Sequence, residues 1–131
     1  MPEPKTKKTT ASAAMKSTRK QAYRKNKHGI KLWVYPAHQR ATEVAYIEVS
    51  HGHFQEFYNK KSTFTYYIIQ GRGTFYLNGE ATPVKATDVV IIPPKTRIWY
   101  LGKMKMTLTT SPAWNAKNEV HVRLIPRSKR K

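Results

Sequence analysis

The chain is a succession of short runs rich in Val, Ile, Tyr, Thr, Phe and Trp, and turn-forming residues separate these runs. Runs of this kind are typical of β-strands. None of them is long enough to carry the period of about 3.6 residues that marks an amphipathic helix. We therefore expect nine strands, at residues 31–35, 43–50, 63–70, 74–77, 81–86, 88–92, 97–101, 103–110 and 119–125.

Two local patterns strengthen this interpretation. Asn78-Gly79 lies between two of the expected strands, and this dipeptide favours a tight hairpin because both turn positions need a positive φ. Residues 103–110 alternate, with Met104 and Met106 facing one way and polar residues the other. The sequence predicts an all-β fold, built as a small sandwich or barrel.

The positive charge is concentrated at the ends of the chain. The formal net charge is +18, and thirteen of the 25 Lys and Arg residues lie in segments 1–28 and 126–131, whose only acid is Glu3. Residues 1–28 also lack Leu, Ile, Val, Phe and Trp, so they cannot bury enough apolar surface to offset the entropy lost on ordering. We expect a disordered basic N-terminal tail over 1–28, a barrel domain over 29–125 and a disordered basic C-terminal tail over 126–131.

Basic tails have two interpretations. They can simply keep the protein in solution, or they can follow a phosphate backbone, which gives strong, salt-sensitive and mostly sequence-independent binding. The candidate nucleic-acid-binding residues are Lys7, Lys8, Lys16, Arg19, Lys20, Arg24, Lys25, Lys27, Arg127, Lys129, Arg130 and Lys131.

Several kinds of chemistry are excluded by the residues present. The chain has no Cys, so it has no disulfide, thiolate nucleophile or cysteine zinc site. There is no apolar run of about 18 residues and no signal peptide, so we expect a cytoplasmic protein without a membrane partner. The acids are scattered and no Gly-rich phosphate loop precedes a helix, so no catalytic residues are assigned.

Two stretches resemble the conserved motifs of the cupin superfamily. Residues 66–75 run from an expected strand through a turn at Gly71 into a second strand, and residues 87–96 run from a strand into a turn at Pro93. The resemblance covers roughly residues 43–111. It implies a jelly-roll β-barrel.

The resemblance also implies a metal bound by a His-x-His pair, a Glu and a second His. Phe64 stands at the position that corresponds to the Glu, and Ile98 at that of the second His. Phe57 and Asn59 stand at the His-x-His positions. Apolar side chains do not ligate metals, so the metal-ligand motif is degenerate and we expect neither a metal nor another cofactor.

A His-x-His does occur at His51-Gly52-His53, closer to the N-terminus than the resemblance requires. If the strand that begins at Glu43 continues straight, both imidazoles face the barrel interior. There they could bind a metal together with Glu56, or they could contact a ligand. If Gly52 instead breaks the strand, both are loop histidines at the surface.

The same alternation places Phe64, Tyr66, Ile98 and Tyr100 inside the barrel. The lumen is then either an aromatic pocket with Tyr hydroxyl groups or is filled by its own side chains. The loop after residue 110 could close one end of the barrel, with Trp114 as its lid. The candidate ligand-binding residues are His51, His53, Phe64, Tyr66, Ile98 and Tyr100.

Three functions are compatible with these patterns. The first is a metal-free barrel that binds a small polar or carbohydrate-like molecule, with tails that contact nucleic acid. The second is an RNA- or DNA-associated protein in which the barrel is a scaffold. The third, implied by the resemblance, is a metal-independent sugar isomerase or epimerase that uses His51 or His53 with Tyr66 or Tyr100 as acid–base partners. Because the strands are apolar on both faces, we also expect a homodimer.

Overall fold

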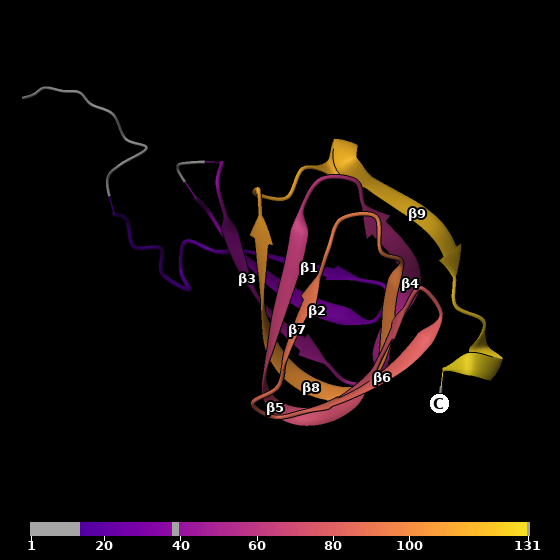
Figure 1. Cartoon of the computed structure of the whole chain (residues 1–131). Helices are drawn as coiled ribbons and strands as arrows, with labels where there is room; N and C mark the ends of the chain where they lie inside the picture. The colour runs from indigo at the N-terminus through magenta and orange to yellow at the C-terminus, as the bar shows by residue number, and fades with distance from the viewer. Residues whose placement is uncertain (1–13, 38–39, 131) are drawn as a thin grey trace, which may run out of the picture.

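The computed structural model describes residues 14–37 and 40–130. Strands make up most of this part of the chain, with two short 3-10 helices near its end (Figure 1). The elements are β1 (Tyr23–Lys27), β2 (Ile30–Tyr35), β3 (Glu43–Val49), β4 (Gly52–Asn59), β5 (Thr63–Leu77), β6 (Glu80–Lys85), β7 (Val89–Ile92), β8 (Ile98–Ser111), η2 (Ala116–Asn118), β9 (Glu119–Leu124) and η3 (Arg127–Lys129).

All strand pairs are antiparallel, and the sheet curls into a barrel. One path runs β1-β2-β3-β8-β4-β9, while β5 pairs with β6, β7 and β8. The long strands β5 and β8 pair from Thr63 and Ser111 at one end to Leu77 and Ile98 at the other. They bend together across the closed end of the barrel, as Figure 1 shows.

Glycine permits this bend. Gly71 on β5 and Gly102 on β8 both have a positive φ, and a Cβ on either would run into the backbone of the opposite strand. Only glycine adopts this conformation without strain at such a close approach. The register of the β5–β8 pair also shifts between Ile68 and Gln70, a bulge of the kind that sharpens strand curvature.

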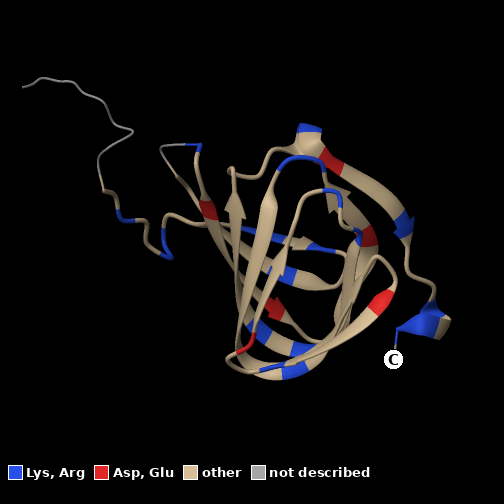
Figure 2. Cartoon of the chain, in the orientation of Figure 1, with Lys and Arg blue, Asp and Glu red and all other residues tan. Residues whose placement is uncertain are grey.

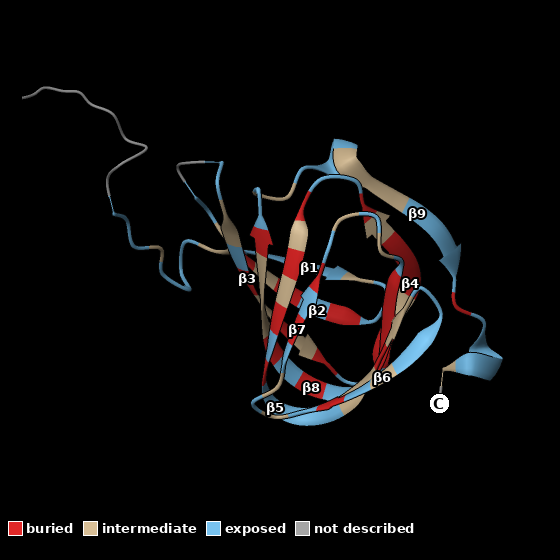
Figure 3. Ribbon diagram, viewed as in Figure 1, coloured by how far each residue is buried: buried red, intermediate tan, exposed pale blue. Residues whose placement is uncertain are grey.

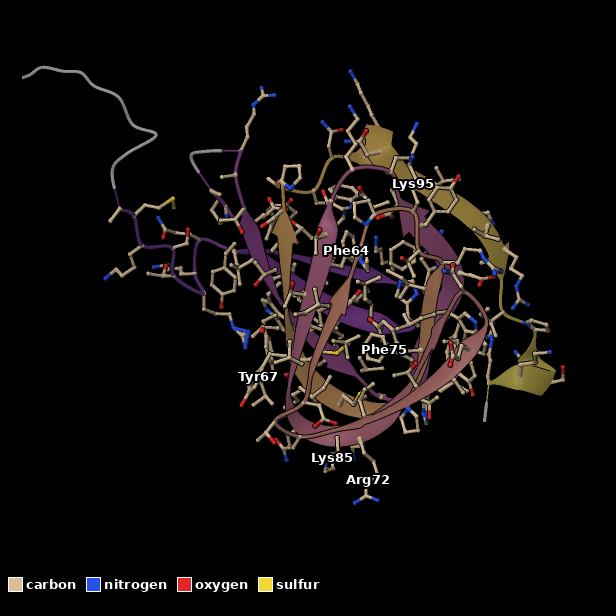
Figure 4. The ribbon with its side chains drawn as sticks, in the orientation of Figure 1. Phe64, Tyr67, Arg72, Phe75, Lys85 and Lys95 are labelled. Atoms are coloured by element: carbon tan, nitrogen blue, oxygen red, sulfur yellow. The ribbon has the colours of Figure 1, made fainter. Side chains whose placement is uncertain are left out.

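The core fills the closed half of the barrel. Ile47, Met106 and Ile68 lie opposite one another on β3, β8 and β5, and each is almost fully buried. Buried and exposed residues alternate along these strands (Figure 3). Phe75 points into the barrel and Tyr67 away from it (Figure 4). One face of the curled sheet therefore supplies the core.

A second apolar cluster lies on the outer side of β4 and β8. Trp99, Leu101 and Ile125 are its buried members. The Trp99 ring stacks on Tyr76 at a centroid distance of 4.1 Å, and the guanidinium of Arg130 lies 4.4 Å from the centre of the Phe54 ring. The segment after β9 is thus packed onto the barrel.

The structure confirms the all-β, cupin-like barrel and differs from the sequence-based expectation in three segments. Tyr23–Lys27, expected in the N-terminal tail, forms strand β1 paired with β2. Gly52–Asn59, which we had not assigned, forms β4. Residues 126–130, expected as a tail, include η3 and pack on the barrel through Arg130. No helix among the described residues is long and apolar enough to cross a membrane.

Candidate functional site

The open half of the barrel encloses a cavity of about 60 Å³, which has room for several water molecules. The lumen is therefore not filled by its own aromatic side chains. Residues from β1 to β5, from β8 and β9, and from the segment between these last two strands form the wall. The polar and aromatic side chains that line it include Tyr23, Lys27, Glu43, His53, Tyr66, Tyr100, Thr110, Trp114 and Glu119.

His53 is a buried, neutral imidazole in this wall. It lies on β4 with 2% of its surface exposed, and its ring centre is 5.1 Å from that of Phe57 and 5.3 Å from that of Tyr100. Its Nδ1 lies 2.9 Å from the carbonyl oxygen of Gln55. Since a carbonyl only accepts, Nδ1 carries the proton and Nε2 keeps a lone pair.

The electrostatics of the pocket keep this imidazole uncharged. Burial lowers the pKa of His53 to about 3, and the positive charge of Lys27 contributes to this lowering, while the hydrogen bond to Gln55 opposes it. At neutral pH His53 is therefore a proton acceptor and not a cation.

Two tyrosines next to His53 remain protonated. Tyr66 and Tyr100 are almost fully buried, and their ring centres are 5.9 Å apart. Burial raises the pKa of both hydroxyl groups above the usual value, and for Tyr66 the charge of Glu119 adds to this effect. Both phenols therefore serve as hydrogen-bond donors or proton donors over the whole physiological pH range.

Trp114 and strand β1 form one side of the pocket. The indole Nε1 of Trp114 donates to Glu119 at 2.6 Å, and Lys27 forms an ion pair with the same carboxylate at 3.6 Å. The ammonium groups of Lys25 and Lys27 lie 5.5 and 5.6 Å from the centre of the Trp114 ring, within the range of cation–π contacts. These contacts fasten the segment after β8 to β1.

Glu43 and Thr110 lie opposite each other on β3 and β8. Burial raises the pKa of the Glu43 carboxyl, and a hydrogen bond from the Trp114 backbone lowers it in part. The Thr110 side chain is buried, and its hydroxyl oxygen has no hydrogen-bond partner among the described residues. The wall thus contains a polar group that the protein itself does not satisfy.

The structure brings together four of the six candidate ligand-binding residues. His53, Phe64, Tyr66 and Tyr100 all line the cavity. His51 does not, because the chain turns between β3 and β4 and leaves this side chain exposed. Ile98 is buried in the core but does not line the cavity. His53 is therefore buried and His51 is exposed, whereas each of our interpretations placed the two histidines in the same environment.

Six wall residues with polar groups were not predicted from the sequence. Tyr23, Lys25 and Lys27 fall in the expected basic tail, and Glu119 falls at the start of an expected strand. Glu43 and Thr110 stood at the ends of expected strands with no motif around them. Only the alternation of inward-facing residues along the strands could have pointed to the last two.

The residues around His53 do not fit a divalent metal. Its ring neighbours are Phe57, Tyr100 and one other imidazole, His28, at a centroid distance of 5.7 Å. Glu56, which could have joined it, binds Arg97 at 3.5 Å and Arg123 at 2.8 Å instead. Residues 14–37 and 40–130 contain no group of three or more His, Asp or Glu side chains placed to hold a metal ion.

Comparison with known proteins gives both close and distant relatives. Pac13, a nucleoside dehydratase, is 48% identical, with a TM-score of 0.86 over 89% of this chain and 98% of that chain. Structures of three Streptomyces PAC13 variants with uridine are 47% identical, with TM-scores of 0.85 and 0.86 over 89% of this chain and 97 to 98% of theirs.

A Planctomyces limnophilus protein is 16% identical, with a TM-score of 0.73 over 84% of this chain and 98% of its own, a likeness in fold alone. Among curated proteins, none matches the chain. A family model, the EutQ-like cupin domain, matches residues 35–121, which is more than half of the sequence. The chain therefore belongs to the EutQ-like cupin family.

Proposed function

We propose that this protein is a nucleoside dehydratase that acts on a uridine-like nucleoside. The observation that carries the proposal is a neutral imidazole, His53, beside two protonated phenols, Tyr66 and Tyr100, in one buried cavity. A nucleoside dehydratase is a more specific function than the small-molecule binding that the sequence predicts.

The spacing of these residues supports the proposal. The three PAC13 variants replace one histidine by glutamine and two tyrosines by phenylalanine, at positions separated by 13 and 34 residues. His53, Tyr66 and Tyr100 are separated by the same two intervals. His51 does not have this spacing.

Loss of water from a nucleoside needs a base and an acid. The base removes a proton from one carbon, the electron pair of that C–H bond forms a C=C bond, and the C–O bond on the neighbouring carbon breaks. Nε2 of His53 has the free lone pair for the first step. A phenol of Tyr66 or Tyr100 can donate to the departing hydroxyl group, which leaves as water after taking up a proton.

The test is turnover of uridine-type nucleosides, with the dehydrated product detected by mass spectrometry. We expect His53→Gln to lower turnover by about 100-fold or more, and Tyr66→Phe and Tyr100→Phe to lower it as well. His51→Gln is the matched control, because His51 is exposed outside the cavity. Full turnover by His53→Gln, or no turnover of any nucleoside by the unaltered protein, would contradict the proposal.

The isomerase or epimerase considered above would use the same imidazole and phenols. Dehydration is preferred because the relatives at 47 to 48% identity include a named nucleoside dehydratase. An inverted sugar centre without loss of water would be the product that favours the alternative.

Contact with nucleic acid through the basic residues stays a prediction. Arg19 and Arg24 lie 4.4 and 5.0 Å from the centre of the Trp33 ring, so part of the predicted set already has partners within the chain. Figure 2 shows Lys and Arg on β8 and β9 as well as near the ends of the described chain. Lys7, Lys8 and Lys131 lie outside the described residues.

We also propose that two copies of the chain pair through the outer face of β3, β8, β5 and β7. Val44, Tyr67, Val89 and Ile91 are exposed on these strands. The register puts Val44 and Ile91 in one row and Tyr67 and Val89 in the next. Thr65 and Thr109 lie between Val44 and Ile91, and Tyr67 and Val89 pair directly, so these positions on β8, β5 and β7 carry no charge. Arg19 lies over Tyr46, at the β3 end of the second row. An apolar face without like charges favours self-association.

A further inference from the structure

The unpartnered hydroxyl of Thr110 points to a ligand contact that the catalytic residues do not explain. Thr110 is 3% exposed and lines the cavity. Its Oγ1 has no hydrogen-bond partner among the described residues. A buried hydroxyl left without any partner costs about 1 to 3 kcal/mol, so the Thr110 hydroxyl is available to bond to the molecule that occupies the cavity.

Thr110 belongs to a row of three residues across adjacent strands. The register pairs it with Glu43 on β3 and with Phe64 on β5. Directly opposed residues in antiparallel strands project to the same face, and all three line the cavity. The row presents a carboxylate, a hydroxyl group and an aromatic ring side by side.

This row lies in a different part of the cavity from the imidazole. His53 pairs with Tyr100 near the start of β8, whereas Thr110 lies near the end of the same strand, opposite Glu43. The cavity therefore has a reactive part around His53 and a second polar part around Glu43 and Thr110.

We propose that Glu43 and Thr110 bind the N–H and the adjacent carbonyl of a uracil-type base, an inference that rests on the proposed nucleoside dehydratase function. A carboxylate accepts hydrogen bonds and a threonine hydroxyl donates one. The matching edge of a ligand has an N–H donor beside a C=O acceptor. The imide edge of uracil provides this pair, and Phe64 provides an apolar surface beside it.

The same arrangement disfavours bases that lack an N–H donor beside a carbonyl acceptor. A methyl group on the imide nitrogen removes the donor and places an apolar group against the Glu43 carboxylate. Cytosine has a ring nitrogen that accepts where uracil donates, and an acceptor that faces a carboxylate is repelled. Leaving a buried polar group unpaired is the strongest source of ligand discrimination available to a site of this kind.

The experiment measures the affinity of the whole chain for uridine, 3-methyluridine and cytidine by calorimetry. We expect the unaltered protein to prefer uridine. Thr110→Val removes the hydroxyl at nearly constant shape, and Glu43→Gln removes the charge. Each is expected to weaken uridine binding by about tenfold and to reduce the preference over 3-methyluridine. Thr110→Ser, which keeps the hydroxyl, is the matched control and should retain both.

Two further measurements distinguish loss of the base contact from misfolding and from loss of turnover. The melting temperature of Thr110→Val should not fall, because the substitution removes an unsatisfied buried group; a weaker affinity then reflects the lost contact and not misfolding. His53→Gln should lose turnover while it retains the preference for uridine.

Uridine binding and preference that are unchanged in Thr110→Val and Glu43→Gln would overturn the base-edge assignment, while the dehydratase function would stand on turnover. An unaltered protein that neither binds nor converts any nucleoside would overturn both.

Discussion

The uncharged state of His53 links the chemistry of the cavity to the stability of the chain. An unfolded histidine has a pKa near 6.5, whereas burial lowers the pKa of His53 in the folded protein to about 3. Between these values the unfolded chain binds a proton at this side chain and the folded chain does not. Acid therefore favours unfolding through this residue.

We predict that the free energy of unfolding falls as the pH is lowered from about 6.5 toward 3. The contribution of His53 is on the order of 4 kcal/mol over the full range. Urea unfolding at pH 7 and pH 4.5 covers about 2 of these pH units, so we expect a fall of about 3 kcal/mol from this residue between them. His53→Gln should flatten the dependence, because glutamine does not titrate. An equal pH dependence in the two proteins would mean that His53 is protonated in the folded state.

At the residue scale the sequence predicted part of the site. Tyr66 and Tyr100 were found because an alternating strand fixes which side chains face inward. His53 was placed inside by continuing the strand from Glu43, but its position comes from β4, which begins after a turn. His51 was assigned to the same face, but the chain turns at this residue, and the alternation does not continue through a turn. The role of Thr110 could not be predicted, since an unpaired hydroxyl exists only once its surroundings have formed.

At the element scale, a buried carboxylate joins β4 to its neighbours. Glu56 is 1% exposed, and its two oxygens bind Arg123 on β9 at 2.8 Å and Arg97 before β8 at 3.5 Å. The guanidinium of Arg123 also lies 6.0 Å from the centre of the Trp99 ring. Glu56 therefore connects the C-terminal strand to the barrel wall.

We predict that Glu56→Gln destabilises the fold by about 2 kcal/mol, because a buried acceptor of two charge-assisted hydrogen bonds loses its charge. Both arginines are partly exposed and can turn to water, which limits the loss. Chemical denaturation measures the effect. Glu80→Gln is the control, since Glu80 is exposed and should change stability by less than about 0.5 kcal/mol. Equal effects of the two substitutions would refute this role of Glu56.

The two strands that were not predicted, β1 and β4, both lack the regular alternation of buried apolar and exposed polar residues. β1 is an edge strand without Val, Ile, Leu, Phe or Trp, and its pairing depends on β2 and on contacts of its lysines across the cavity. β4 buries Gln55, Glu56 and Asn59, which contradicts the usual pattern of polar residues outside. Its polar side chains are tolerated because partners distant in sequence bind two of them.

At the scale of the whole molecule, the uncharged outer face leads to a prediction about assembly. Ile91 is 66% exposed on β7, at the β7 end of the proposed contact. Ile91→Lys introduces a positive charge into this apolar face, and we expect it to shift the protein toward monomers. Light scattering after size-exclusion chromatography measures the mass.

Leu124→Lys is the matched control for this prediction. Leu124 is 60% exposed, but it lies on β9, outside the proposed face. It should leave the assembly unchanged. A monomeric unaltered protein, or an equal shift by both variants, would contradict pairing through this face.

The position of β1 determines which shortened proteins can be informative. Tyr23, Lys25 and Lys27 belong to the cavity wall, although composition alone would assign them to a tail. A chain trimmed to residue 29 would keep His53 and both phenols but would lack the cations that hold Trp114 and the ion pair with Glu119. Its cavity would be open on one side, so a ligand screen that finds nothing with such a fragment would reflect the trimming and not the whole chain.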